Sequence, residues 1–185
     1  MEIQKEGQGL NAETLVISAQ QGNKEAFVQL IKEMEHSLYK ISRAILLTDS
    51  ECLDAVQETI LIAYTTLHQV REPKYFKTWI TRILINECNN IRKKQTKIVK
   101  MDGIVEPSIM EQRDAIIDLK TAIQSLEPDL RTVITLYYYE DLSVKEIGTI
   151  LDIASGTVKS RLNRARTKLF SLLHVNKIEG RMLHE

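Results

Sequence analysis

The sequence predicts an all-α protein with two small helical domains joined by a flexible linker. Of 185 residues, only 7 are Gly and 3 are Pro, and the abundant Leu, Ile, Lys and Glu favour helix. Apolar residues recur at helical spacing along most of the chain. Residues 95–112 interrupt this pattern, and that stretch is long for a connection inside one compact domain.

These patterns divide the chain into five parts. A chain of this length can bury one sizeable core or two small ones. We expect an N-terminal tail at 1–12, a first helical domain at 13–94, the linker at 95–112, a second helical domain at 113–174 and a C-terminal tail at 175–185.

In the first domain, helical spacing runs through residues 12–45 until the polar residues 48–51 break it. Asp49 or Ser50 is expected to cap the next helix, which fades near Val70.

A proline sets the next boundary. Pro73 disfavours helix at the residue before it, so residues 71–74 are expected to form a loop. A long helix is then expected from about 75 to 94, and it carries a polar face opposite an apolar one.

The second domain ends in a predicted helix-turn-helix. Ser143 and Glu146 have the spacing of a capping box. The first helix is expected to end at Leu151. After a turn at 152–154, Ser155 is expected to cap the second helix, which reads DNA in this motif.

The equal numbers of basic and acidic residues, 25 each, conceal an uneven distribution. Residues 71–100 hold nine Lys or Arg and two Glu, and residues 153–178 hold six Lys or Arg and no acid. Residues 44–70 hold four acids and no Lys or Arg. A single basic segment is usually a solvated face. Two basic segments on separate helical domains instead favour a protein that binds a polyanion, such as nucleic acid, at two sites.

Several other classes are disfavoured. No apolar run reaches the roughly 20 residues of a membrane helix, and the polar N-terminus is unlike a signal peptide. Cys52 and Cys88 form no CxxC pair and are expected to be reduced thiols rather than a disulfide or metal site. No arrangement typical of a catalytic site, a metal site or a phosphate-binding loop occurs, so we expect no enzyme activity, metal or cofactor.

An aromatic and basic cluster begins the long helix of the first domain. Phe76 and Trp79 could be core residues, or the cluster could be a platform on which unstacked single-stranded bases stack. In the second case the loop at 70–74 could form one wall of a pocket for a flipped base. The candidate residues are Lys74, Tyr75, Phe76, Lys77, Trp79, Arg82, Asn86, Asn89 and Lys93.

The second helix of the helix-turn-helix carries the other candidates. Val158 and Leu162 are expected to face inward. Arg161 or Ser160 is expected to read bases, whereas Lys159 and Arg166 are expected to meet phosphates. The alternative is an ordinary helical hairpin with a basic solvated face. The candidate residues are Ser155, Thr157, Lys159, Ser160, Arg161 and Arg164.

Three fragments in this order resemble bacterial sigma factors of the extracytoplasmic-function group. They are AVQETILIAY, FKTWITRILIN, and LEPDLRTVITLYYYEDLSVKEIGTIL followed by SGTVKSRLNRARTKL. The resemblance covers about residues 13–173, and the linker is poorly matched. The chain departs from the family at Gly148, where many members have Ala, and at Asp152, where many have Gly.

The resemblance implies a cytoplasmic initiation subunit of a stress or envelope response that directs core RNA polymerase to promoters. Asp54, Gln57 and Glu58, otherwise a solvated face, would contact core polymerase. The aromatic and basic cluster would melt and read the minus-ten element, and the helix-turn-helix would read the minus-thirty-five element. It also implies that an anti-sigma factor, often membrane-anchored, binds the protein. It implies no small-molecule substrate and no direct insertion into a membrane.

Two other functions fit parts of the sequence. A stand-alone helix-turn-helix repressor with a helical dimerisation or sensor domain would bind its operator without polymerase. An RNA-binding adaptor is the third hypothesis. The aromatic and basic cluster before residue 95 disfavours the repressor, which has no need to melt DNA.

Overall fold

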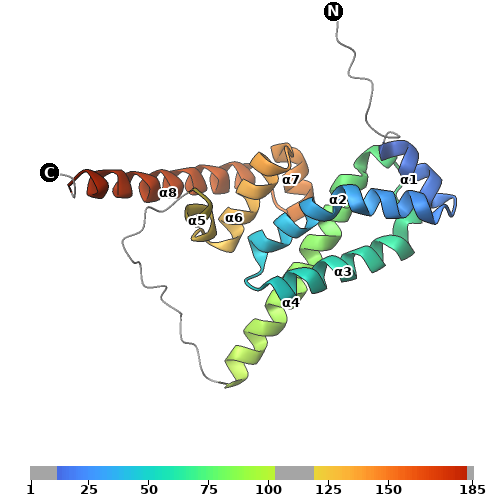
Figure 1. The fold of residues 1–185 in the computed structure, drawn as a ribbon, viewed down its shortest axis with the longest axis horizontal. Helices are drawn as coiled ribbons and strands as arrows, with labels where there is room; N and C mark the ends of the chain where they lie inside the picture. The colour runs from blue at the N-terminus through green and yellow to red at the C-terminus, as the bar shows by residue number, and fades with distance from the viewer. Residues whose placement is uncertain (1–11, 103–118, 183–185) are drawn as a thin grey trace, which may run out of the picture.

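The computed structural model describes residues 12–102 and 119–182, and the secondary structure of these residues is helical. The all-α prediction is therefore confirmed (Figure 1). The helices are α1 (Ala12–Gln20), α2 (Lys24–Ile45), α3 (Asp49–Thr66), α4 (Phe76–Asp102), α5 (Leu119–Gln124), α6 (Pro128–Ile134), α7 (Val144–Leu151) and α8 (Ser155–Met182). Short 3-10 turns at Leu67–Gln69 and Pro73–Tyr75 precede α4, and a π-helical turn at Thr135–Tyr139 follows α6.

The first domain is a bundle in which α2, α3 and α4 pack on one another and α1 packs on α2. Its core is built from apolar residues at helical spacing, among them the fully buried Leu30, Leu38, Ile80 and Leu84. Burial of this apolar face is what stabilises helices of this length.

The start of α3 differs from the prediction. Neither Asp49 nor Ser50 is the cap, because the helix begins one residue earlier and Thr48 occupies that position. The Thr48 hydroxyl accepts from the Glu51 amide, and the Glu51 carboxylate accepts from the Thr48 amide. This reciprocal pair is a capping box, which satisfies two amides that the helix leaves free.

Helix α4 is longer than predicted. It ends at Asp102, so residues 95–102 of the predicted linker are helical. The remainder of that linker, 103–112, lies outside the described residues, as do the first residues of the predicted second domain. The predicted loop at 71–74 runs into the 3-10 turn that begins at Pro73.

The helix-turn-helix is confirmed as α7 and α8. Ser143 and Glu146 form the predicted capping box. Asp152 ends α7 in the left-handed region, at φ 54°, which aspartate tolerates better than most residues. Helix α8 begins at Ser155, so this residue is the first helical residue rather than the cap.

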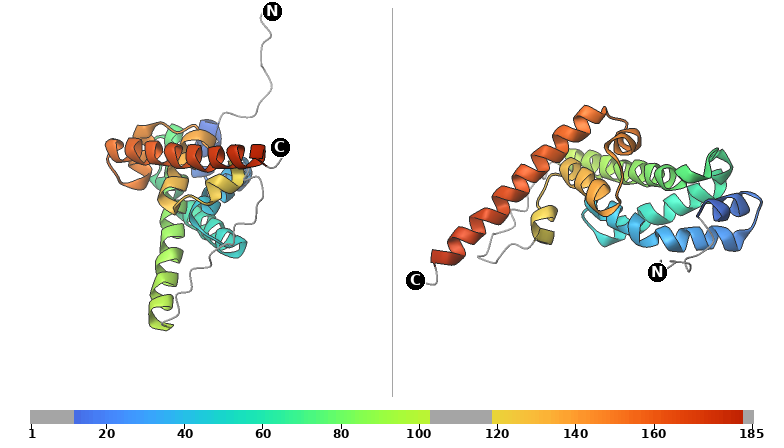
Figure 2. Two further views of the ribbon diagram at one scale, coloured as in Figure 1. Left: turned by 90° about the vertical axis from the view of Figure 1, so that its left-hand side faces the viewer. Right: turned by 90° about the horizontal axis from the view of Figure 1, so that it is seen from above.

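The two domains pack directly against each other. Helices α2 and α4 of the first domain contact α6, the π-helical turn and α7 of the second. In Figures 1 and 2, α8 runs from this junction away from the first domain.

Candidate nucleic-acid interface

The aromatic cluster at the start of α4 divides between the core and the surface. Phe76 is 4% exposed and belongs to the core, which corrects its assignment as a base-stacking residue. Trp79 is half-buried, and its ring centroid lies 5.9 Å from that of Phe76. Tyr75 is 53% exposed, with Lys74 Nζ 4.9 Å from its ring centroid. Tyr75 and, in part, Trp79 are thus the rings of this cluster that solvent can reach.

The polar face of α4 lies where the spacing predicted. Arg82, Asn86 and Lys93 are exposed, and Asn89 is half-buried. The opposite face supplies the buried Ile80, Leu84 and Cys88 to the core. This separation leaves amide and cationic groups in a row on the solvent side of one helix.

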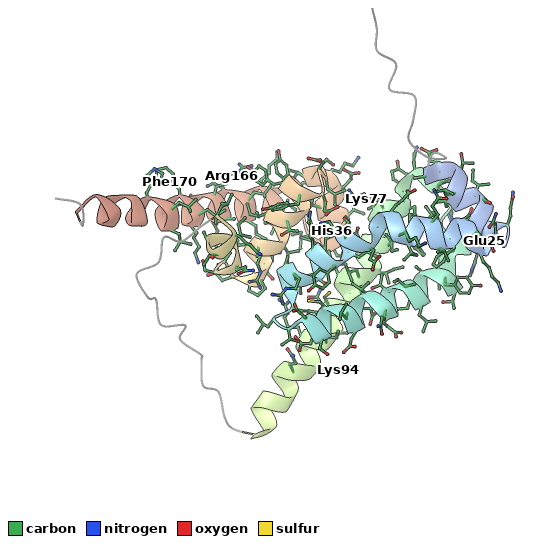
Figure 3. All side chains as sticks on the ribbon, viewed as in Figure 1. Glu25, His36, Lys77, Lys94, Arg166 and Phe170 are labelled. Carbon is green, nitrogen blue, oxygen red and sulfur yellow. The ribbon has the colours of Figure 1, made fainter. Side chains whose placement is uncertain are left out.

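Lys77, which is labelled in Figure 3, differs from its neighbours because its ammonium group already has an acidic partner in the second domain. Its ammonium group donates to the Glu140 carbonyl oxygen at 2.9 Å and lies 3.2 Å from the Glu140 carboxylate. Glu140 is 6% exposed and belongs to the second domain. The sequence marked Lys77 as a nucleic-acid contact and did not indicate this partner.

The exposed side of α8 carries most of the predicted readers. Val158 and Leu162 are buried, as expected. Arg161 forms a 2.7 Å ion pair with Asp129 of α6. The other predicted residues are all exposed: Ser155, Thr157, Lys159, Ser160 and Arg164.

Arg166 does not stand free to meet a phosphate, contrary to expectation. Its Nε donates to the Tyr138 hydroxyl at 2.9 Å, and its guanidinium lies over the rings of Tyr137 and Tyr138. Cation–π contacts of this kind stabilise packing between elements. Arg166 therefore joins α8 to the π-helical turn.

Two glycines of the helix-turn-helix, Gly148 and Gly156, differ in how closely other atoms approach them. A Cβ at Gly148 would lie 2.9 Å from the Ile153 carbonyl oxygen, so α7 and the turn approach too closely for a larger residue. A Cβ at Gly156, in contrast, would meet nothing within 4 Å.

The acidic stretch forms a separate face on α3. Asp54, Gln57 and Glu58 are exposed, as a docking surface requires. Leu53 and Leu61 are 51% and 58% exposed and lie on the same helix. The sequence analysis did not identify these two leucines, which add exposed apolar surface beside the carboxylates.

Buried polar groups at the junction were also missed. Arg131 is 8% exposed, and burial, together with the charge of Arg43, lowers the pKa of its guanidinium. Arg131 Nε donates to the Ala44 carbonyl at 2.7 Å, and Nη1 donates to the Gln124 carbonyl at 2.6 Å. No local pattern marks such a residue, because its acceptors come from other elements.

Cys52 and Cys88 are free thiols in the structure. Both are buried, and burial raises the pKa of Cys88 to about 12, so this thiol stays protonated. Within the described ranges, no group of three or more His, Cys, Asp or Glu is placed to hold a metal ion. A helix both long and apolar enough to cross a bilayer is likewise absent from those ranges.

Both halves of the chain match known families. Residues 30–98 match the family described as Sigma-70 region 2, and residues 116–169 match Sigma-70, region 4. The chain is 32% identical to the RNA polymerase sigma-H factor of Pseudomonas aeruginosa over 170 residues, covering 82% of this chain and 88% of that protein. It is 30% identical to the ECF RNA polymerase sigma factor SigW of Bacillus subtilis, and the match covers 80% of this chain and 89% of that protein.

A solved structure has the same arrangement of helices. It is that of the sigma factor RpoE from Bartonella quintana in complex with the anti-sigma factor NepR. The TM-score is 0.66 at 28% identity, with 80% of this chain and 97% of that chain covered. Together with the matched regions and the relatives, this shows that the chain belongs to the extracytoplasmic-function sigma factors of the sigma-70 family.

Proposed function

We propose that the chain binds core RNA polymerase and directs it to promoters, where it recognises two DNA elements and helps to open the duplex. The observation that carries the proposal is the order of three surfaces on one chain. An acidic and apolar face on α3 comes first, the aromatic and amide-bearing face of α4 second, and the helix-turn-helix of α7 and α8 third.

The α3 face is proposed to dock on core polymerase. Asp54, Gln57 and Glu58 supply negative charge and an amide, and Leu53 and Leu61 supply exposed apolar area beside them. A patch of this composition fits a partner surface that is basic at its rim and apolar at its centre.

The exposed part of α4 is proposed to hold unstacked bases of the minus-ten element. Tyr75 and the accessible edge of Trp79 offer aromatic surface, and Asn86 offers an amide that can both donate and accept. The remaining exposed cations of this surface suit the phosphates of a single strand. The complete proposed set is Lys74, Tyr75, Lys77, Trp79, Arg82, Asn86, Asn89 and Lys93.

Helix α8 is proposed to enter the major groove of the minus-thirty-five element. Its first exposed turns carry hydroxyl and cationic side chains, which are the groups that reach base edges and phosphates. The proposed set is Ser155, Thr157, Lys159, Ser160, Arg161 and Arg164.

We further propose an anti-sigma factor as regulatory partner, because the related RpoE structure is a complex with one. A protein with this function acts where core polymerase is, in the cytoplasm, and needs no enzyme activity of its own.

Run-off transcription tests the proposal. The purified chain is added to core polymerase with a library of promoter fragments, and we expect defined transcripts that neither component makes alone. Specific DNA binding by the chain alone, as a symmetric dimer and without transcripts, would instead support the stand-alone repressor.

Asn86→Ala tests the melting role. We expect less permanganate reactivity in the melted region with unchanged core binding. Asn90→Ala is the matched control, because Asn90 is also exposed on α4 and bonds to Glu87 of its own helix. Equal reactivity for Asn86→Ala and wild type would reject the assignment.

A further inference from the structure

The segment that joins α3 to α4, residues 67–75, carries one end of the proposed minus-ten surface. It begins with the 3-10 turn Leu67–Gln69, ends with the 3-10 turn Pro73–Tyr75 and leads directly into α4. Lys74 and Tyr75 at its end are exposed members of the proposed DNA-binding set. The conformation of the 67–75 segment therefore decides where the Tyr75 ring lies.

The backbone of this segment forms few hydrogen bonds of its own, as is usual for short 3-10 turns. The Val70 amide donates to the Leu67 carbonyl at 3.1 Å, and the Tyr75 amide donates to the Glu72 carbonyl at 3.0 Å. Leu67 and Val70 are buried. A buried carbonyl oxygen without a partner destabilises a conformation, so donors from another element would hold this segment in place.

Gln20, the last residue of α1, supplies such donors. Its side-chain Nε2 donates to the Leu67 carbonyl at 3.0 Å and to the Val70 carbonyl at 2.7 Å. An amide nitrogen carries two hydrogens, so these two bonds use both of them. The two acceptors lie 47 and 50 positions away in the sequence. One side chain of α1 thus clamps the first part of the 67–75 segment.

The rest of α1 keeps Gln20 against the segment. Leu15 and Val16 of α1 are buried, and α1 contacts both 3-10 turns. Figure 1 shows α1 beside the chain that joins α3 to α4. Gln20 itself is exposed, so its contribution is hydrogen bonding rather than burial of apolar surface. After the segment, the buried Phe76 anchors the start of α4, so the chain between Val70 and α4 is fixed at both ends.

We propose that Gln20 is a positioning residue of the minus-ten surface. By holding the Leu67 and Val70 carbonyls, it keeps the 67–75 segment in the conformation in which Tyr75 receives an unstacked base. It acts through the segment and makes no contact with DNA itself. The proposal rests on the proposed function, because it requires Tyr75 to contact the minus-ten strand.

Pre-organisation is the physical reason for such a clamp. A base that binds to an already ordered segment does not have to order it, so less of the binding free energy is lost. When the competent conformation is only partly populated, the apparent affinity falls by the same fraction. We expect loss of the Gln20 amide to weaken binding about fivefold, which corresponds to about 1 kcal/mol, the typical net contribution of a hydrogen bond.

Hydrogen exchange of the free full-length chain tests the clamp without DNA. Gln20→Met removes both donors and keeps the length of the side chain. The Val70 amide, which donates to the Leu67 carbonyl, should exchange about fivefold faster in this variant than in wild type. Gln29→Met is the matched control, because Gln29 is exposed on α2 and bonds to Glu33 of its own helix. Equal exchange at Val70 in Gln20→Met and wild type would overturn the clamp.

Binding of the holoenzyme to partly single-stranded DNA gives the second readout. The DNA is a promoter from the run-off assay whose non-template strand is unpaired at the minus-ten element. Gln20→Met should bind it about fivefold more weakly than Gln29→Met and should show a relaxed base preference at one minus-ten position. Affinity for core polymerase and preference at the minus-thirty-five element should not change. If affinity for core polymerase falls as much as affinity for this DNA, Gln20 merely supports the fold and the proposal fails.

Gln20→Lys is the rescue variant. Its ammonium group carries three donors on a side chain of similar reach, so it can bond to both carbonyls. Gln29→Lys adds the same charge on α2 and corrects for general attraction to DNA. Relative to Gln29→Lys, Gln20→Lys should recover the wild-type exchange at Val70 and the wild-type base preference. If it behaves like Gln20→Met, hydrogen bonding at this position does not position the segment and the proposal is wrong.

The same measurements separate this proposal from the proposed function. If the wild-type holoenzyme shows no base preference at the minus-ten element, the proposed function fails. If wild type shows a preference and Gln20→Met keeps it in full, only the positioning role fails.

Discussion

Arg131 of α6 reaches across the domain junction and donates a 2.7 Å hydrogen bond to the carbonyl of Ala44, near the end of α2. A second bond, to the Gln124 carbonyl of α5, means that this one side chain of α6 is bound to both α2 and α5. It is a buried cation, and the oxygens that stabilise its charge are backbone carbonyls.

Replacing Arg131 by Met should destabilise the protein. The change removes two charge-assisted hydrogen bonds and leaves carbonyl oxygens without these donors, which costs about 2–4 kcal/mol. Denaturant unfolding followed by circular dichroism measures the effect. Lys145→Met is the control, since Lys145 is exposed on α7. An unchanged midpoint for Arg131→Met would show that the junction does not depend on this residue.

Gly148 and Gly156 make a matched pair for the packing of the helix-turn-helix. Gly148→Val should cost roughly 1–3 kcal/mol of unfolding free energy, because its Cβ would lie 2.9 Å from the Ile153 carbonyl. Gly156→Val should be close to neutral, since space is open there. Thermal unfolding of both variants checks this. Similar losses in the two would mean that helix propensity, rather than close approach, decides the outcome.

The capping box of α7 predicts a pH-dependent term in stability. Hydrogen bonds from the Ser143 side chain and backbone amide hold the pKa of Glu146 below its ordinary value. The carboxylate therefore stabilises the fold above its unfolded pKa of about 4.3, and this stabilisation is lost as the pH falls through the lower folded pKa. The stability difference between wild type and Glu146→Gln should be full at pH 7 and vanish in acid. A difference that is constant with pH would contradict this.

Glu58→Lys should weaken binding to core polymerase by roughly fivefold or more, because an ion pair at an interface rim contributes up to about 1 kcal/mol and the reversal adds repulsion. Competition between the variant and labelled wild-type protein for core polymerase measures this loss of affinity. Glu35→Lys is the control, because Glu35 is exposed on α2, outside the proposed docking face. Equal competition by Glu58→Lys and wild type would place the docking surface elsewhere.

Lys159 and Arg161 should differ in how they affect recognition of the upstream element. Lys159→Ala should weaken binding to all DNA sequences alike and reduce the salt dependence of binding, as loss of a phosphate contact does. Arg161→Ala should cost roughly 1–3 kcal/mol and relax the preference at one position. Binding of the holoenzyme to a randomised element separates the two. An altered preference in Lys159→Ala would reverse the roles.

Much of the fold was readable from local sequence. Helical periodicity predicted the elements, and Ser143 with Glu146 predicted the start of α7. The same local information is compatible with the longer α4. Between Lys94 and Asp102 no Gly or Pro occurs, so nothing in the local sequence required α4 to end at Lys94.

Sequence alone determined which residue types stand on each helix face, because side-chain period and capping depend on neighbours a few residues away. Tertiary structure decided which of those faces is covered. It buried Phe76, left Leu53 and Leu61 exposed, and gave Lys77 and Arg161 acidic partners. Glu140 meets Ser37 from 103 positions away and Arg131 meets Ala44 from 87. Such contacts depend on how two domains pack, and no local periodicity encodes that packing.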